Sequence, residues 1–377
     1  MLKFLATTIK GMEDIAAREI EELGGCNIEL KSERIFFQGD ENLIYRINIR
    51  SRCIHKLIFI LNHGKAMGLD EIYSLAKSIE YSEVIGLHQT FAVRTTRVGK
   101  HDYTSIDVSA TVGQAIVDYF NEVKGARPRV NLKNPDVEIS VYVKDDEVTI
   151  GVNTTGESLH RRNYRVYDHP AAIKTTLASC MVRLSDWHGE EFLDPMCGGG
   201  TIAIEAALMA RKFPPGFFRR NLAFTRLLFY EAEAHKNELE KALEEVDRSC
   251  FKICGFDLSP KHVNGAIINA SSAGVDDTIS FFVQDATRED AYKTVNAKYI
   301  VVNPPYGIRQ YRPRILKDLY IRFLKALSCS LSGSTLVLIT GAPRIFEEAL
   351  AYINCKIIEI RSVKHGNLPA KVYKLVM

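Results

Sequence analysis

The stretch LDPMCGGGTIAIEAA, residues 193–207, decides the fold of the second half of the chain. An apolar, strand-like segment ends at Asp194, three glycines follow, and a helical pattern begins at Thr201. Gly198 and Gly200 allow the backbone to approach a ligand closely, and the helix start offers free N–H groups. The glycines also match the G-x-G-x-x-A dinucleotide fingerprint, but that match alone is weak, and a tight turn without a ligand is the alternative.

Strand-like and helical segments alternate from about residue 171 onward. This alternation predicts right-handed βαβ units and a parallel sheet, which is an α/β fold. Two strand-like segments, KIIEIRSVKHG at 356–366 and AKVYKLVM at 370–377, close the chain. Their short connection predicts a hairpin that places an antiparallel strand on the otherwise parallel sheet.

The first half of the chain differs, because short strands and short helices alternate there in two α+β units. We expect the first unit in residues 1–65 and the second in residues 66–152. The second should end in a β-hairpin that turns at Asp145 and Asp146. Residues 153–170 are polar and basic, and we interpret them as a linker.

Composition limits the function classes. The 377 residues are 46% hydrophobic and 25% charged, as in ordinary soluble proteins. No apolar run approaches a membrane span, and the N-terminus turns acidic too early for a signal peptide. Eight cysteines without a C-x-x-C pair favour reduced thiols in the cytoplasm over disulfides or a zinc cluster, so we expect no metal.

The net charge of +3 permits a nucleic-acid partner without indicating one. Residues 1–152 carry 19 Lys and Arg against 22 Asp and Glu, so any RNA contact there must use a local patch. The densest basic runs are RRNYR at 161–165, RKFPPGFFRR at 211–220 and RQYRPR at 309–314. Any one of them alone is more often a solvated loop than a binding site.

Acidic residues end three successive strand-like segments, at Asp194, Asp257 and Asp285. A carboxylate just before the glycines would repel a pyrophosphate, whereas it would attract a ligand that carries an ammonium and a sulfonium. A second strand-end carboxylate can hold ribose hydroxyls, and a third can accept from an adenine amino group. A single such Asp is more often a turn former, but the three together predict an S-adenosylmethionine site.

The stretch VVNPPYGIR, residues 301–309, falls at the end of the next strand, where ligands bind in open α/β sheets. The Asn303 side-chain oxygen and the Pro304 carbonyl can both accept from one exocyclic amino group and stabilise its developing positive charge. Tyr306 can stack on the base, and Gly307 allows it to come close. A Pro-Pro turn alone would explain the break in the strand but neither the amide nor the ring.

Together, Asp194-Pro195-x-Cys197-Gly198-x-Gly200-Thr201 and Asn303-Pro304-Pro305-Tyr306-Gly307-x-Arg309 resemble the class I RNA guanine-N2 methyltransferases that carry a THUMP domain. GVNTTGESLHRRNYR, at 151–165, is similar to the family's domain junction. One departure is Gly199, where a serine is common. The resemblance implies an N-terminal ferredoxin-like domain at 1–65, a THUMP domain at 66–152, a linker at 153–170, and a Rossmann-like methyltransferase domain with a mixed seven-stranded sheet at 171–377.

The resemblance and the strand-end pattern together give three sets of candidate site residues. The catalytic set is Asn303, Pro304 and Tyr306. The cofactor set is Ala171, Thr176, Asp194, Pro195, Cys197, Gly198, Gly200, Thr201, Asp257, Leu258, Asp285, Ala286 and Asn303. The substrate set is Arg161, Arg162, Arg165, Tyr306, Gly307 and Arg309.

The resemblance implies that S-adenosylmethionine donates a methyl group to a guanine N2 in tRNA. A motif that begins with Asn is more similar to the enzymes acting at guanosine 6 than to those acting at guanosine 10, which usually begin it with Asp. Guanosine 6 is paired, so the base must be flipped out. A 23S rRNA guanine-N2 methyltransferase, an adenine N6 methyltransferase and a catalytically inert RNA-binding protein remain alternatives. We expect a monomer in the cytoplasm, with tRNA as its partner and no membrane contact.

Overall fold

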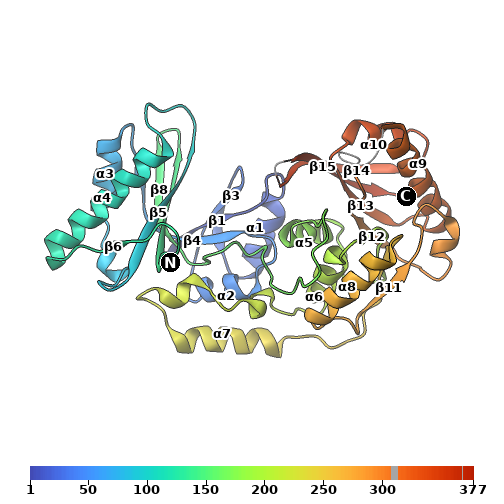
Figure 1. Cartoon of the computed structure of the whole chain (residues 1–377), viewed down its shortest axis with the longest axis horizontal. Helices are drawn as coiled ribbons and strands as arrows, with labels where there is room; N and C mark the ends of the chain where they lie inside the picture. Colours follow the sequence, from blue (N-terminus) through green and yellow to red (C-terminus); the bar gives the residue numbers. More distant parts are fainter. Residues whose placement is uncertain (307–312, 367) are drawn as a thin grey trace.

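The computed structural model of the chain describes residues 1–306, 313–366 and 368–377. These residues form two sheets, one of eight strands in the first part of the chain and one of seven in the second (Figure 1). The expected α/β class is confirmed, with a mixed seven-stranded sheet preceded by smaller α+β units. No helix among the described residues is long and apolar enough to cross a membrane.

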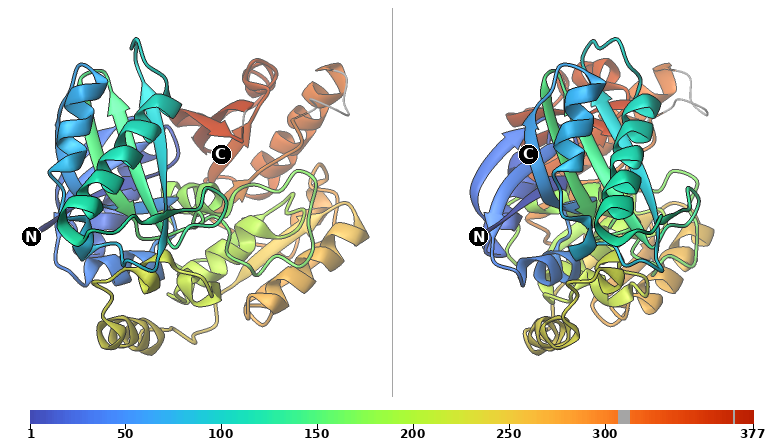
Figure 2. Two further views of the ribbon diagram at one scale, coloured as in Figure 1. Left: turned by 60° about the vertical axis from the view of Figure 1, so that its left-hand side comes forward. Right: turned by 90° about the vertical axis from the view of Figure 1, so that its left-hand side faces the viewer.

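The first sheet has the order β2-β3-β1-β4-β8-β7-β5-β6. Its strands are β1 (Leu2–Thr7), β2 (Cys26–Lys31), β3 (Arg34–Gly39), β4 (Lys56–Lys65), β5 (Thr90–Val98), β6 (Arg129–Val130), β7 (Val137–Lys144) and β8 (Glu147–Asn153). Its helices are α1 (Glu13–Glu22), α2 (Leu43–Arg50), α3 (Leu69–Lys77), η1 (Tyr81–Glu83) and α4 (Ser105–Lys124). Helices α3 and α4 lie side by side over one face of the sheet (Figure 2).

Strand β4 joins the two N-terminal units into one sheet, because it pairs antiparallel with β1 on one side and with β8 on the other. Sequence patterns gave two separate α+β units and no sign of this shared strand. The expected hairpin of β7 and β8 is present, and its turn contains Asp145 with a left-handed φ of +53°. The two N-terminal units are therefore connected by hydrogen bonds as well as by the chain.

The second sheet has the order β11-β10-β9-β12-β13-β15-β14. Its strands are β9 (Phe192–Asp194), β10 (Ile253–Asp257), β11 (Ile279–Val283), β12 (Tyr299–Val302), β13 (Thr335–Thr340), β14 (Lys356–His365) and β15 (Leu368–Val376). Strand β15 pairs antiparallel with β13 and β14, as the sequence predicted, and the other pairs are parallel. The strand order reverses at β9, between β10 and β12, and such a switch point is where open α/β sheets bind ligands.

Helices cover both faces of this sheet. They are α5 (Thr175–Leu184), α6 (Thr201–Ala210), α8 (Pro260–Ser272), η4 (Glu289–Tyr292), α9 (Pro313–Ser330) and α10 (Pro343–Leu350). The apolar faces of α5, α6 and α8 belong to a core that continues into the N-terminal units, whereas those of α9 and α10 form a second core on the other face. The second sheet thus shares one of its two cores with the N-terminal half.

A long insert between α6 and β10 runs from the second sheet back along the first half (Figure 1). It contains η2 (Pro215–Phe218), η3 (Ala223–Arg226) and α7 (Ala232–Glu244). The Phe224 N–H donates to the Thr154 carbonyl at 2.8 Å, and Arg226 Nε donates to the Asp136 carbonyl at 3.0 Å. The insert therefore contacts the second N-terminal unit directly as well as the linker.

Candidate cofactor and substrate site

The glycine loop lies between β9 and α6 at the switch point of the second sheet. Gly198 and Gly200 have left-handed φ angles of +52° and +79°, which favour glycine. A Cβ at Gly200 would lie 3.0 Å from the Cβ of Ala266 on α8, so this position also lacks room for a side chain. The loop is therefore a tight turn whose shape requires glycine, as the sequence predicted.

The linker passes across this loop, and α8 holds it there. Asn269 is 2% exposed, and its Nδ2 donates to the carbonyls of Gly199 at 2.9 Å and Tyr167 at 3.0 Å. A Cβ at Gly199 would lie 3.3 Å from the Cβ of His169. This crowding gives a physical reason why the smallest residue suits position 199, where a serine is common in the family that the sequence resembles.

Asp257 ends β10 beside the loop, and its carboxylate is fixed by main-chain donors. The Gly198 N–H donates to Oδ2 at 3.0 Å, and the Ser259 N–H donates to Oδ1 at 2.9 Å. His262 Nδ1 lies 3.3 Å from Oδ1, and the ring of His262 meets that of His169 at 4.4 Å. A carboxylate has about four acceptor positions, so Oδ2 still has one that can accept from a ribose hydroxyl beside these neighbours.

A pocket of about 310 Å³ opens at the carboxyl ends of β10 and β11. Leu258 and Val283, which are 70% and 48% exposed, give it apolar surface, and Asp285 gives it an acceptor. Asp285 Oδ1 accepts from the Thr287 N–H at 2.9 Å, which fixes the carboxylate. The structure brings Leu258 and Asp285 together at this pocket, where an acceptor lies beside apolar surface.

Asp194 lies at the end of β9 and is only 1% exposed. Burial, and secondarily the charge of Asp257, raises the pKa of Asp194 well above its ordinary value. The Met196 N–H reaches Oδ1 at a long 3.4 Å. A buried carboxylate with a raised pKa would be stabilised by a cationic ligand, which agrees with a site for the charged methionine end of S-adenosylmethionine.

Asn303 follows β12 on the other side of β9, and both ends of its amide have partners. The Tyr306 hydroxyl donates to Oδ1 at 2.6 Å, and Nδ2 donates to the Ala171 carbonyl at 3.4 Å. His365, at the end of β14, places its Nδ1 3.1 Å from the Tyr306 oxygen, with the two rings edge to face at 5.7 Å. The oxygen expected to accept from the substrate amine is thus occupied by a hydroxyl of the protein.

Burial determines the protonation states of Tyr306 and His365. Burial raises the pKa of the Tyr306 hydroxyl, and the nearby Tyr320 adds to that effect, so the hydroxyl remains a donor at neutral pH. Burial is also the main cause that lowers the pKa of His365, so its ring is neutral. The Nδ1 of His365 faces the same tyrosine oxygen, and the tautomer of the ring sets which of the two atoms donates. The Tyr320 hydroxyl donates to the Pro305 carbonyl at 3.1 Å and so fixes the turn that contains Asn303.

Several candidates lie away from the site or outside the described residues. Arg162 was expected to contact RNA but is 2% exposed, with its Nε 3.5 Å from Glu205, so burial excludes that role. Thr176 is fully buried, and its hydroxyl lies 3.4 Å from His55 of the N-terminal half, which gives no support for a cofactor contact. Gly307 and Arg309 lie outside the described residues.

The remaining candidates divide by exposure. Arg165 is half-buried and donates to the Thr201 hydroxyl at 3.1 Å, so it holds the linker against the start of α6. Arg161 is exposed and available to a partner. Three candidates are buried around the loop and the strand ends: Pro195, Cys197 and Ala286.

Sequence reasoning missed the histidines and the amide that surround the site, namely His169, His262, His365 and Asn269. Each is an isolated residue without a motif spacing, and the fold alone brings it to the switch point. Asn269 binds the linker across 103 residues of chain, and His365 meets Tyr306 across 59. No group of three or more potential metal ligands occurs among the residues that the structure describes.

Comparison with known families divides the chain into three parts. Residues 162–371 match the RMKL-like methyltransferase domain, residues 67–153 match the THUMP domain, and residues 3–57 match the RlmL ferredoxin-like domain.

Two curated relatives align over nearly the whole chain, and both are named tRNA (guanine(6)-N2)-methyltransferase. The protein from Methanocaldococcus jannaschii is 39% identical over all of both chains. The protein from Archaeoglobus fulgidus is 40% identical over 99% of this chain and 91% of its own. The ribosomal RNA large subunit methyltransferase K/L of Pseudoalteromonas atlantica is 32% identical over 90% of this chain but only 49% of its own.

Solved structures share the fold over the full length. A possible methylase from Clostridium difficile 630 superposes with a TM-score of 0.89 at 29% identity, over 99% of this chain and 97% of that one. A methyltransferase complexed with S-adenosylhomocysteine superposes with a TM-score of 0.87 at 23% identity over the same shares, which shows the common fold.

Proposed function

Since the chain belongs to the RMKL-like methyltransferases that carry a THUMP domain, we propose that it methylates N2 of guanosine 6 in tRNA, with S-adenosylmethionine as the methyl donor. The observation that carries the proposal is the arrangement at the switch point. Carboxylates suited to the cofactor line one side of β9, and an Asn-Pro-Pro-Tyr turn suited to an aromatic amine lies on the other. The full-length relatives named for this reaction make guanosine 6 the leading substrate.

We assign the cofactor's parts to the groups described above. Asp194 would face the ammonium and sulfonium charges, Asp257 would accept from the ribose hydroxyls, and Asp285 with Leu258 would hold the adenine. When bound, S-adenosylmethionine supplies an electrophilic methyl group. Glycine also suits position 198 because a side chain there would meet the ring of His169 at 3.2 Å.

Asn303 and the Pro304 carbonyl would orient the substrate amine. The nitrogen lone pair of guanine N2 is delocalised into the ring, so two acceptors that localise positive charge on the amino group lower the barrier. They also direct the nitrogen toward the methyl carbon, which supplies proximity and orientation. The Tyr306 hydroxyl takes one of the two acceptor positions of Asn303 Oδ1, so its departure would leave both positions to the substrate amine.

Displacement of Tyr306 would also make its ring available to stack on the substrate base. Guanosine 6 lies in the paired acceptor stem, so its base must be flipped out at a cost of a few kcal/mol. When the Tyr306 ring turns away from His365 it can stack on the flipped base, which offsets about 1–3 kcal/mol of that cost. Movement of Tyr306 would thus couple the arrival of the base to the release of the Asn303 acceptor.

Methyl transfer can be tested directly on RNA. Unmodified tRNA transcripts and rRNA fragments are incubated with the enzyme and isotopically labelled S-adenosylmethionine, and the nucleosides are analysed by mass spectrometry. We expect label only in N2-methylguanosine at position 6 of tRNA. Label in rRNA alone would favour the ribosomal alternative, label in N6-methyladenosine the adenine alternative, and no label an inert RNA-binding protein.

Asn303→Ala separates chemistry from binding. It should leave S-adenosylmethionine and tRNA affinities within about threefold of the wild type, yet reduce the single-turnover rate by about 100-fold or more, because the lost interaction is strongest in the transition state. A wild-type single-turnover rate would remove Asn303 from the mechanism. We further propose that the enzyme acts as a monomer in the cytoplasm and that the first 152 residues contribute to RNA binding.

A further inference from the structure

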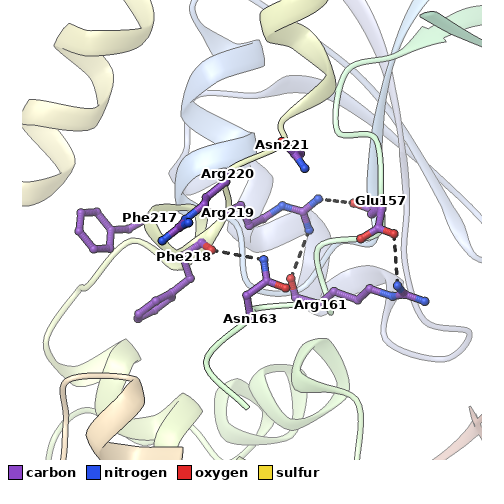
Figure 3. A pocket seen from close by; sticks show the side chains of 8 residues that line it. All are labelled: Glu157, Arg161, Asn163, Phe217, Phe218, Arg219, Arg220 and Asn221. Carbon is purple, nitrogen blue, oxygen red and sulfur yellow. Dashed lines mark hydrogen bonds and ion pairs between the residues drawn. The ribbon is translucent and has the colours of Figure 1, made fainter. Parts of the chain in front are cut away.

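A pocket of about 560 Å³ lies where the linker meets the insert, and the reaction described above does not use it. Glu157 and Arg161 line it from the linker, and Phe217, Arg219 and Arg220 line it from the insert (Figure 3). Figure 3 shows Arg219 reaching from the insert to the linker, with Phe217 and Arg220 on the insert side. Two of the three basic runs in the sequence therefore meet at one concave surface.

The pocket has a fixed frame. The Arg219 guanidinium donates to the carbonyls of Glu157 at 2.6 Å and Ser158 at 2.9 Å, which clips the insert to the linker. On the other side the insert is pressed against α2, since a Cβ at Gly216 would lie 2.7 Å from the Asn48 carbonyl. A ligand would therefore meet a surface that is largely preformed, which reduces the entropy lost on binding.

The pocket holds more positive charge than its own anion can neutralise. Glu157 is the one carboxylate among its lining residues, and Arg161 already pairs with it at 3.2 Å. The hydrogen bonds of Arg219 within the described part of the chain all go to main-chain oxygens. Burial, and secondarily the cation of Arg162, lowers the pKa of Arg219 to about 10. An anion placed here would relieve an unfavourable concentration of cations.

An aromatic ring stands beside these cations. Phe217 is 52% exposed, and its ring packs edge to face on Phe213 at 5.3 Å and on Phe218 at 5.9 Å. These contacts hold the ring in place while one side faces solvent. Inorganic phosphate would need only the arginines, whereas an unpaired nucleotide offers a phosphate for the arginines and a base for the ring.

We infer that this pocket binds an unpaired nucleotide of the substrate RNA, with Arg220 and Arg161 on its phosphates and Phe217 stacked on its base. The inference rests on the proposed function, because it assigns part of the tRNA contact. Asn163 at the pocket and Ala171 at Asn303 are eight residues apart, so their Cα atoms are at most about 29 Å apart. One RNA molecule can reach both places.

Two substitutions should give different signatures in the full-length protein. Arg220→Ala should weaken tRNA binding and reduce the slope of log K against log [KCl] by about one, because one phosphate contact is lost. Phe217→Ala should weaken tRNA binding about fivefold to 100-fold without changing that slope. Phe217→Trp should bind tRNA with the wild-type affinity, because it keeps an aromatic ring. Both alanine substitutions should raise the KM for tRNA and leave kcat and S-adenosylmethionine affinity unchanged. The exposed Lys325 of α9 supplies a matched control, since Lys325→Ala should alter neither quantity.

The measurements are fluorescence anisotropy of labelled tRNA across a KCl series and steady-state methylation, with thermal unfolding to confirm that each variant is folded. An acceptor-stem hairpin without unpaired flanking nucleotides should show no effect of Phe217→Ala. An unchanged salt slope and KM in Arg220→Ala, or an equal Phe217→Ala effect on the paired hairpin, overturns the inference. A wild-type enzyme that fails to methylate tRNA overturns the proposed function instead, so the two failures are distinguishable.

Discussion

At the scale of single residues, Tyr306 has two separable parts. Its hydroxyl occupies the Asn303 oxygen, whereas its ring is the part proposed to stack on the flipped base. Tyr306→Phe should therefore keep most of the single-turnover rate, because the ring is retained and the Asn303 acceptor is released. Tyr306→Ala should lose about tenfold or more, because stacking is worth about 1–3 kcal/mol. Quenched-flow methylation of tRNA measures both rates, and a Phe variant as slow as the Ala variant would assign the hydroxyl to the chemistry.

The buried carboxylate of Asp194 should destabilise the ligand-free protein and favour binding of the cationic cofactor. Its folded pKa lies above the unfolded value near 3.8, so the folded state binds the extra proton, and this group's contribution to stability is lost as pH rises through the folded pKa. Asp194→Asn should stabilise the ligand-free protein at pH 8 by about 1–3 kcal/mol, because it removes a buried charge. It should also weaken S-adenosylmethionine binding by at least tenfold.

Chemical denaturation at pH 5 and pH 8 tests the stability part. The stabilisation by Asp194→Asn should be larger at pH 8, where the wild-type carboxylate is more ionised. Calorimetry tests the binding part, and wild-type affinity should rise with pH over the same range, since the cationic ligand prefers the ionised carboxylate. Equal stability of variant and wild type at both pH values would contradict the raised pKa.

Arg162 is a buried cation of the linker, and we expect it to contribute to the stability of the fold. Its guanidinium donates to the carbonyls of Leu159 at 2.7 Å and Arg52 at 2.8 Å and faces Glu205, which is itself fully buried. Arg162→Met should destabilise the protein by about 3–5 kcal/mol, because it removes a buried cation that faces Glu205 and leaves the Leu159 and Arg52 carbonyls without this donor. Arg162→Met with Glu205→Gln should recover much of that loss. Urea unfolding of the single and double variants measures the coupling, and strictly additive losses would deny it.

Much of the site could be predicted from single residues, for a clear physical reason. Gly198 and Gly200 are required by local backbone geometry, and Asp257 and Asp285 follow strands whose carboxyl ends must meet. Local geometry and strand ends are visible in a sequence. The Tyr306–His365 contact was not visible, because it joins the ends of two strands that the fold alone brings together.

At the scale of elements, the insert shows the limit of sequence patterns most clearly. Its aromatic and basic residues are typical of an exposed loop, yet Phe224 is fully buried, and its N–H bonds to the linker. The hairpin of β14 and β15 and the alternating strands of the second half were predicted correctly, because their patterns are local. Burial of the insert depends on a partner surface from another part of the chain, which no local pattern reports.

Strand β4 gives a similar lesson. Its apolar residues indicated either a strand or a mixture of helix and strand, and pairing on both sides depends on two neighbours, one of which is β8, about 90 residues later in the chain. Local patterns therefore predicted the two units correctly but not the continuous sheet that joins them. A domain boundary placed at residue 65 falls at the end of the very strand that connects them.

At the scale of the whole molecule, the two halves depend on each other for burial. Arg162 of the linker bonds to Arg52, and the Thr155 hydroxyl donates to Asn48 at 2.6 Å, so removal of the first half would expose polar groups as well as apolar surface. We expect a fragment that begins at residue 153 to aggregate or to lack a cooperative unfolding transition. Co-expression with residues 1–152 should restore a soluble, active complex.

Circular dichroism, gel filtration and tRNA methylation compare the fragment, the reconstituted pair and the intact chain. An isolated fragment that folds cooperatively and methylates tRNA at the wild-type rate would show that the first half contributes neither burial nor RNA binding. A folded but inactive fragment would separate the two contributions.

The continuous eight-stranded sheet bears on how the enzyme selects the nucleotide that it methylates. A sheet joined by β4 and β8, and held to the catalytic half by the insert, would keep the surfaces proposed to contact RNA at a set distance from Asn303. An enzyme of this kind would select its target nucleotide by its distance along the RNA helix rather than by contacts to particular bases. One base pair added between the contacted end of the RNA and guanosine 6 would then move the methyl group to the neighbouring nucleotide.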